Sequence, residues 1–266
     1  MFNVVQYSIW DLRVKIETNK PCELYVDMFP NTPKNSIRIL WMAEPDEISG
    51  IKKIVLQRYK EFDLILTHNS EVLEMCSNSR LHTFGTTWIL DYNYNQIKKY
   101  CVTSLIGGKQ LSSNHTLRQK IPQIKSEIDN IELQLFGSIN YPFLGEGIDQ
   151  TMKDNDRKNE LFYSQYHIAI ENFSKENFFT EKLMDCFQTK TIPIYMGCPN
   201  ISDFFDIRGM YVVNSLEEIA NVIKNLTPET YFELEEYIEI NYKLSKPHSH
   251  FRERLKNVVS DFVNKN

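Results

Sequence analysis

The sequence has few of the features that assign a protein to a class at once. Its five cysteines form no CxxC pair and are odd in number, so they indicate neither a zinc site nor a complete disulfide framework. This use of cysteine fits a reducing interior best. No run approaches the roughly 18 apolar residues that cross a bilayer, and the first residues lack a positive segment followed by a long apolar core. We therefore expect a soluble, cytoplasmic protein without a signal peptide or membrane anchor.

Two common phosphate-binding patterns are absent as well. The sequence contains neither the GxGxxG of dinucleotide-binding folds nor the GxxxxGK[ST] of P-loop proteins. Its formal net charge of −5 argues against a nucleic-acid-binding surface across the whole protein. A local basic pocket for a small anion is compatible with that charge.

Size and composition are those of an ordinary globular protein. Two modest α/β domains fit the 266 residues as well as one large domain does. Apolar runs alternate with segments of helical periodicity, an order that implies parallel sheets covered by helices. In the first hundred residues we predict strands over 37–44, 62–69 and 81–88 and helices over 48–61 and 69–76. After a new start near Lys98 we predict strands over 100–108, 131–138 and 209–215 and helices over 115–128 and 216–226.

The stretch "YHIAIENFSKENFFTEKLMDCFQTKTIPIYMG" (166–197) places charged and amide groups where a strand gives way to a helix. The predicted helix begins near Thr180, Glu181 and Lys182. A helix start exposes unpaired N–H groups and a partial positive charge, which favour a phosphate, and a lysine adds a full charge. A threonine cap with a solvated lysine explains the same residues equally well.

Two further positions could carry chemistry. Gly107 and Gly108 follow a predicted strand, and Arg118 lies in the next helix. The two glycines can let the backbone approach a ligand that the arginine binds. A plain turn followed by a surface arginine explains the same residues. Glu44 follows the strand "IRILWMA", at the edge where functional groups of parallel sheets collect. It can act as a base of raised pKa, or it can open the next helix beside Pro45.

The stretch from 166 to 205, "YHIAIENFSKENFFTEKLMDCFQTKTIPIYMGCPNISDFF", resembles the donor-binding motif of the α-1,3-fucosyltransferases, glycosyltransferase family ten. That motif reads Tyr-Lys-Phe-x-x-x-Phe-Glu-Asn, a short gap, Tyr-Val-Thr-Glu-Lys, and then Val/Ile-Pro-Val-x-x-Gly. Upstream, "IRILWMAEPDE", "FDLILTHN" and "VTSLIGG" with Arg118 are similar to further segments of the family. The chain is thereby identified as a divergent member.

The resemblance implies a GT-B fold, in which two Rossmann-like domains face a cleft. It implies an acceptor-side domain at 1–97, a nucleotide-sugar-binding domain at 98–245, and a C-terminal helix at 246–266 that packs back on the first domain. It also implies an inverting transfer of fucose from GDP-β-L-fucose to a glycan hydroxyl, with an α-1,3-type linkage. The two cations and the helix start implied at the donor site can offset the charge of the leaving group, so we expect no divalent metal and no cofactor.

The roles of individual residues follow from the same resemblance. Glu44 matches the general base, and Arg118 and Lys182 match the residues that hold the pyrophosphate. Glu181 matches a residue near the ribose. The remaining positions implied to line the donor pocket are Glu171, Asn172, Phe178 and Thr180.

Three departures from the family pattern bear on specificity. Phe178 replaces a tyrosine, Pro45 replaces an asparagine, and His167 replaces a lysine. They affect the identity of the sugar and of the acceptor more than the nucleotide site. A GT-B enzyme for another nucleotide-diphosphate sugar, and a non-catalytic sugar- or nucleotide-binding relative, are the alternatives.

Overall fold

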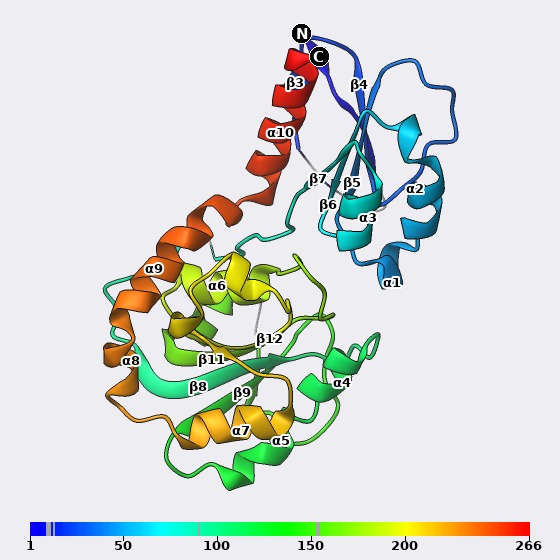
Figure 1. The fold of residues 1–266 in the computed structure, drawn as a ribbon. Coiled ribbons are helices and arrows are strands. Elements are labelled where there is room, and N and C mark those ends of the chain that lie inside the picture. Colours follow the sequence, from blue (N-terminus) through cyan, green and yellow to red (C-terminus); the bar gives the residue numbers. More distant parts are fainter. Residues whose placement is uncertain (9–11, 13, 90, 153–154) are drawn as a thin grey trace. The chain divides into compact units, whose positions relative to one another are not determined.

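The computed structural model describes residues 1–8, 12, 14–89, 91–152 and 155–266. These residues divide into two compact units. Unit 1 comprises Met1–Phe84, Lys175–Phe178 and His250–Asn266, and unit 2 comprises Gly85–Ser174 and Phe179–Ser249. Each unit is built around its own parallel sheet (Figure 1).

Unit 1 has a five-stranded parallel sheet among its described residues, in the order β2-β4-β5-β6-β7. The strands are β2 (Val5–Ser8), β4 (Cys22–Val26), β5 (Ile37–Met42), β6 (Leu64–Thr67) and β7 (Ser79–Leu81). A short antiparallel pair, β1 (Phe2–Asn3) and β3 (Glu17–Thr18), accompanies it. The helices are α1 (Asp46–Ser49), α2 (Lys52–Arg58), α3 (Ser70–Met75) and α10 (Phe251–Lys265).

Alternation along the strands of unit 1 creates two apolar faces. Ile39 and Trp41 of β5 belong to the core shared with α10, whereas Leu40 between them belongs to the core shared with α2 and α3. The helix α10 presents one buried residue every fourth position, which is the spacing of a single helical face. These residues are Phe251, Leu255, Val259 and Val263. The C-terminal helix therefore forms the third layer of unit 1.

Unit 2 has a six-stranded parallel sheet among its described residues, in the order β10-β9-β8-β11-β12-β13. The strands are β8 (Lys99–Ile106), β9 (Glu132–Gly137), β10 (Gln150–Thr151), β11 (Ser164–Ile170), β12 (Ile192–Met196) and β13 (Tyr211–Val212). The helices are α4 (Ser113–Arg118), α5 (Ile121–Ile124), α6 (Glu181–Gln188), α7 (Leu216–Lys224), α8 (Thr230–Glu233) and α9 (Glu235–Ser245), with a 3-10 segment at Asn155–Tyr163.

The two faces of this sheet carry different helices. Ile121 of α5 and Ile223 of α7 pack in the core on one face, and Leu183 of α6 packs with Phe162 in the core on the other. The neighbouring strands β8 and β11 are therefore followed by helices on opposite faces. This reversal opens a crevice just beyond the carboxyl ends of the two strands.

The units differ from the predicted domain ranges at both ends of the second domain. Residues 85–97 belong to unit 2, where the hydroxyls of Tyr92 and Tyr94 donate to Phe162 O at 2.6 Å and to Gln188 O at 2.8 Å. Ser249 also belongs to unit 2, and its carbonyl accepts from Thr87 N at 2.8 Å. The C-terminal helix α10 belongs to unit 1.

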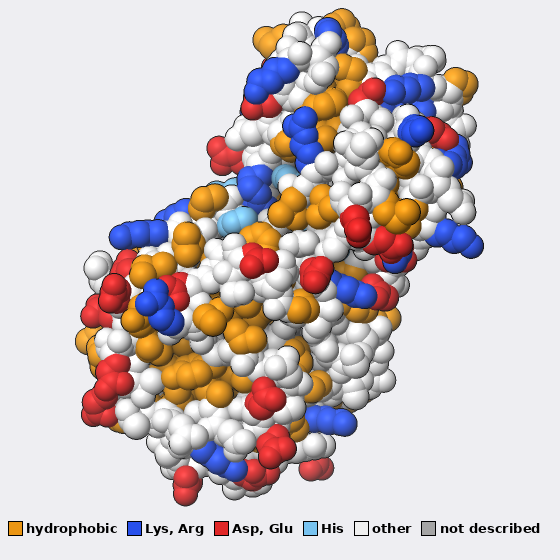
Figure 2. Space-filling view, viewed as in Figure 1, with side chains coloured by type: hydrophobic (Ala, Val, Ile, Leu, Met, Phe, Trp, Pro, Cys, Tyr) orange, Lys and Arg blue, Asp and Glu red, His pale blue; other side chains and the backbone are white. Residues whose placement is uncertain are grey.

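Acidic side chains are spread among basic ones on the face of the described residues drawn in Figure 2. Among the helices of these same residues, none combines the length and the apolar character needed to cross a lipid bilayer.

Candidate functional site

A cavity of about 300 Å³ lies at the carboxyl edge of the unit 2 sheet. Gly107, Ser138 and Asn172 line it, each just past the end of β8, β9 or β11. The cavity therefore occupies the crevice where the strand order reverses. Its charged and imidazole lining residues are Lys109, His115, Arg118, Lys158, His167, Glu181 and Lys182. Of the residues predicted for the donor pocket, Arg118, Asn172, Glu181 and Lys182 meet here.

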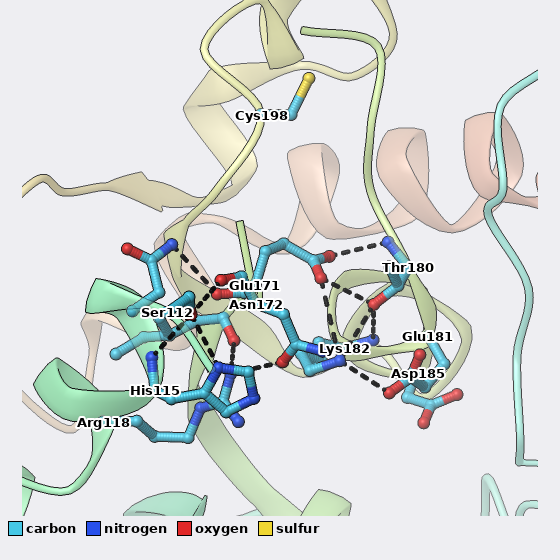
Figure 3. A network of polar contacts seen from close by, with 12 residues as sticks. Ser112, His115, Arg118, Glu171, Asn172, Thr180, Glu181, Lys182, Asp185 and Cys198 are labelled. Carbon is cyan, nitrogen blue, oxygen red and sulfur yellow. Dashed lines mark hydrogen bonds and ion pairs between the residues drawn. The ribbon is translucent and has the colours of Figure 1, made fainter. Parts of the chain in front are cut away.

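Glu171 ties the end of β11 to the start of α6. Its side chain is fully buried, and its two carboxylate oxygens accept from Thr180 N and Thr180 Oγ1, each at 2.7 Å (Figure 3). Burial raises the pKa of Glu171, while Lys182 opposes the rise. Neither Glu171 nor Thr180 lines the cavity. They fix the backbone from which the lining residues project.

Lys182 and Glu181 form an ion pair at the first turn of α6, with 3.0 Å between Nζ and Oε1. The Lys182 amine also donates to Thr180 Oγ1 at 3.3 Å, and Thr180 caps the helix by accepting from Lys182 N at 3.4 Å. The cap and the lysine are thus parts of one arrangement. Burial alone raises the pKa of Glu181, but Lys182 and Lys158 outweigh burial and lower this pKa to about 2. Glu181 is an ionised acceptor at neutral pH.

Arg118 reaches the same edge from α4. Its Nη2 donates to Ile170 O at 2.6 Å and to Asn172 Oδ1 at 3.1 Å (Figure 3). Burial lowers the pKa of Arg118, and Glu171 and Glu181 oppose this. An arginine keeps its charge under such a shift, so the cavity holds a fixed cation oriented by the end of β11.

Lys158 and Asp185 belong to the site but were missed in the sequence. Asp185 lies one turn after Glu181 on α6 and is fully buried. Its Oδ1 accepts from Thr87 Oγ1 and from Trp88 N, both at 2.8 Å, and its Oδ2 accepts from Lys158 Nζ at 2.5 Å. Asp185 thereby holds a third cation at the wall of the cavity. In the sequence, the only signal for Asp185 was its spacing of four residues from Glu181 on one predicted helix.

Glu44 lies in unit 1, just after β5, and is half-buried. Its backbone N–H donates to both carboxylate oxygens of Asp27 at 3.2 Å, and Ala43 N donates to Asp27 Oδ1 at 2.9 Å. Asp27 is buried and adopts a left-handed conformation with φ of 51°. A second carboxylate, which sequence reasoning missed, therefore restrains the backbone of the predicted base.

Phe178 has different surroundings from the other predicted donor residues. It belongs to unit 1 with Lys175–Phe178, and its ring contacts that of His68 with centroids 4.8 Å apart. The neighbouring Asn177 Nδ2 donates to His68 O at 3.2 Å. The position where the family pattern has tyrosine is thus part of the unit 1 core rather than of the cavity lining.

Comparison with known proteins gives a consistent result. A family described as "Glycosyltransferase family 10 (fucosyltransferase) C-term" matches residues 104–251. An α-(1,3)-fucosyltransferase, FucT of Helicobacter pylori, is 28% identical over 81 residues. That alignment covers 30% of this chain and spans 17% of the length of the curated relative.

Solved structures agree on the fold. An α1,3-fucosyltransferase crystallised with GDP is 14% identical, with a TM-score of 0.52 over 88% of this chain and 77% of its own. The apo structure of OtsA is 9% identical, with a TM-score of 0.62 over 92% of this chain and 73% of its own. These likenesses, together with two α/β units that each contain a parallel sheet and a helical C-terminal segment, confirm the expected GT-B class of fold.

Proposed function

This chain belongs to glycosyltransferase family 10, and we propose that it is an inverting enzyme that transfers fucose from GDP-β-L-fucose to a hydroxyl group of a glycan acceptor. The observation that carries the proposal is the cavity of unit 2, where Arg118 and Lys182 line the wall beside the amino terminus of α6. Two cations and the partial positive charge of a helix start suit a diphosphate.

The same groups suit the chemistry of the leaving nucleotide. When the bond between the sugar and the phosphate breaks, its electron pair stays on the phosphate oxygen. Arg118, Lys182 and the start of α6 would stabilise that charge, and loss of one such preorganised donor typically costs about 2.7–4 kcal/mol of transition-state stabilisation. These groups supply positive charge without a divalent metal, so we expect transfer to continue in a metal chelator.

Glu181 is suited to the ribose of the nucleotide. Its ionised carboxylate lines the cavity, forms an ion pair with Lys182 and is attracted by Lys158. A carboxylate accepts hydrogen bonds from a pair of hydroxyl groups, so Glu181 would fix the ribose while the lysines prevent its protonation.

Glu44 is the proposed general base. Inversion requires one group to take the proton of the attacking hydroxyl as the new bond to the sugar carbon forms. Family resemblance assigns this step to Glu44, and the hydrogen bonds from Ala43 N and Glu44 N to Asp27 support it by restraining the chain at that position. The identity of the acceptor would be determined by the loops of unit 1, where the match to the family is weakest.

Thermal shift with a panel of nucleotides tests the donor class. We expect GDP and GDP-fucose to raise the melting temperature and UDP to leave it unchanged. Donor hydrolysis and transfer to fucose acceptors, each with and without EDTA, then test the sugar and the requirement for metal. A rise with UDP instead would favour the alternative of another nucleotide sugar, and no rise with any nucleotide would contradict the transferase proposal.

A further inference from the structure

We propose that His115 is a proton-linked ligand of the donor diphosphate: it takes up a proton when the donor binds and then donates a hydrogen bond from Nε2 to a phosphate oxygen. This inference rests on the proposed function. It adds to the cavity a residue whose charge depends on whether the diphosphate is present.

The position of His115 makes such a contact available. It lies on α4 one turn before Arg118, so the two side chains project from the same side of the helix. The residue is only 4% exposed, and it lines the same cavity as Arg118 and Lys182 (Figure 3). Its imidazole therefore faces the space assigned to the diphosphate.

A chain of hydrogen bonds determines which ring nitrogen carries the proton. Ser112 Oγ donates its one hydrogen to Asn172 O at 2.5 Å. Ser112 Oγ also lies 2.7 Å from His115 Nδ1, and with its hydrogen already engaged it can only accept there. The proton of the neutral ring therefore resides on Nδ1, and Nε2 carries a lone pair.

The surroundings keep this ring neutral in the free protein. Burial lowers the pKa of His115 to about 4, and Arg118, Lys182 and Lys109 add to the effect. These cations belong to its own helix, to the start of α6 and to the loop after β8. The carboxylates of this edge, Glu171 and Glu181, are engaged by Thr180 and Lys182 rather than by the imidazole.

A bound diphosphate reverses these conditions. Its negative charge offsets the cations around His115, and a phosphate oxygen opposite the lone pair of Nε2 would repel it. Protonation from solvent converts Nε2 into a donor, while Nδ1–H keeps its bond to Ser112. During transfer the electron pair of the broken bond stays on the phosphate, where the imidazolium stabilises it, and the proton of the acceptor hydroxyl goes to the base. His115 returns its proton to solvent when the nucleotide leaves.

The test measures GDP-fucose affinity against pH for the wild type, His115→Gln and His250→Gln. The donor diphosphate is esterified at both ends and has no group that titrates near neutral pH. Glutamine can donate from a position close to that of Nε2 but does not ionise, and His250 is an exposed residue of unit 1. Between the free and bound pKa values, affinity changes by up to tenfold per pH unit. We expect the wild-type Kd to fall at least tenfold from pH 8 to pH 5.5, as for His250→Gln, and to change less than threefold for His115→Gln.

Calorimetry and NMR make the result specific. In buffers of different ionisation enthalpy, donor binding should take up more protons in the wild type than in His115→Gln. Imidazole ¹⁵N spectra of the wild type should show an unprotonated Nε2 that becomes protonated on donor addition, a readout that does not depend on any variant folding. Binding with the same pH profile in wild type and His115→Gln, or an unchanged Nε2 signal, would overturn this inference alone. Absence of binding at every pH would overturn the proposed function with it.

Discussion

The carboxyl edges of the two sheets differ in charge, because cations outnumber carboxylates in the lining of the unit 2 cavity. In unit 2, the end of β11 is surrounded by Arg118, Lys158 and Lys182, and the nearby Glu171 is buried in bonds to Thr180. In unit 1, Asp27 follows β4 and Glu44 follows β5. The backbone N–H of Glu44 donates to the carboxylate of Asp27. One edge presents positive charge to a cavity, and the other presents carboxylates.

Under the proposed function, this difference lets one architecture serve two tasks. Parallel sheets collect functional groups at the same edge whatever their sign, so the strand order determines where chemistry happens and the loop residues determine which chemistry. A cationic edge is suited to holding a leaving phosphate, and an anionic edge is suited to accepting a proton. Substitutions at the two edges should therefore affect different kinetic quantities.

The largest expected effect is on the anionic edge. Glu44→Gln removes the proton acceptor while preserving the size of the side chain, so kcat should fall about 10²-fold to 10⁴-fold. The affinity for GDP should stay within twofold of the wild type because unit 2 is unchanged. Steady-state transfer assays and titration calorimetry measure the two quantities. A wild-type kcat in this variant would remove Glu44 as the base.

The next effect is on the cationic edge. Lys182→Ala removes one charge-assisted hydrogen bond to the diphosphate, worth about 1.5–3 kcal/mol, and should weaken GDP binding about 10-fold to 150-fold. Lys224→Ala serves as the matched control, because Lys224 at the end of α7 pairs with Glu127 and does not line the cavity. Calorimetry should find the control unchanged. Equal Kd values for both variants would contradict the phosphate role of Lys182.

A smaller effect tests how the anionic edge is held. Asp27→Ala leaves the N–H groups of Ala43 and Glu44 without their carboxylate acceptor, and an unmet buried donor costs about 1–3 kcal/mol. We expect a lower melting temperature and a kcat reduced about tenfold, with KM for the donor unchanged. Asp27→Asn keeps one acceptor oxygen and tolerates the left-handed backbone, so it should recover most of both quantities. No difference between the alanine and asparagine variants would argue against the positioning role.

The smallest effect is expected at a surface ion pair of unit 1. Lys175 pairs with Glu47, and both side chains are more than 40% exposed. Such pairs contribute about 0–1 kcal/mol, so Lys175→Ala should lower the melting temperature by at most about 3 °C. The shift should vanish in 1 M salt, where exposed charges are screened. A large shift in calorimetric scans at both salt concentrations would contradict a weak, screened ion pair and would show that Lys175 stabilises unit 1 by packing instead.

Much of the fold could be predicted from periodicity. The buried strands β5, β6 and β9 fall within predicted strands, and β8 begins one residue before its predicted range, because each is a compact apolar run. The prediction for 81–88 was wrong: β7 ends at Leu81, and the following residues are held by isolated bonds such as that from Thr87 to Asp185. No local pattern reveals a loop whose partners lie about a hundred residues away. The strands β2 and β4 were missed, since no strand was predicted before residue 37.

Most of the candidate site that could be predicted lies in one motif, and Arg118 was predicted from a separate segment. Glu171, Thr180, Glu181 and Lys182 lie within 12 residues of one another, and the structure joins them in one network. Lys158 is held at the cavity by a salt bridge to Asp185, which lies 27 residues further along the chain. Such pairings arise from tertiary packing, so composition and spacing carry no signal for them.

The path of the chain between the units limits how this protein can be divided. Unit 1 consists of three separate stretches, the shortest being Lys175–Phe178 inside the motif whose flanks build the cavity. A chimera that exchanged residues 1–84 alone would leave behind α10, whose Leu255 and Val259 are fully buried in the core of unit 1. Exchange of the whole of unit 1 therefore requires four crossovers, at 84/85, 174/175, 178/179 and 249/250, so a single crossover cannot separate the two units of this chain.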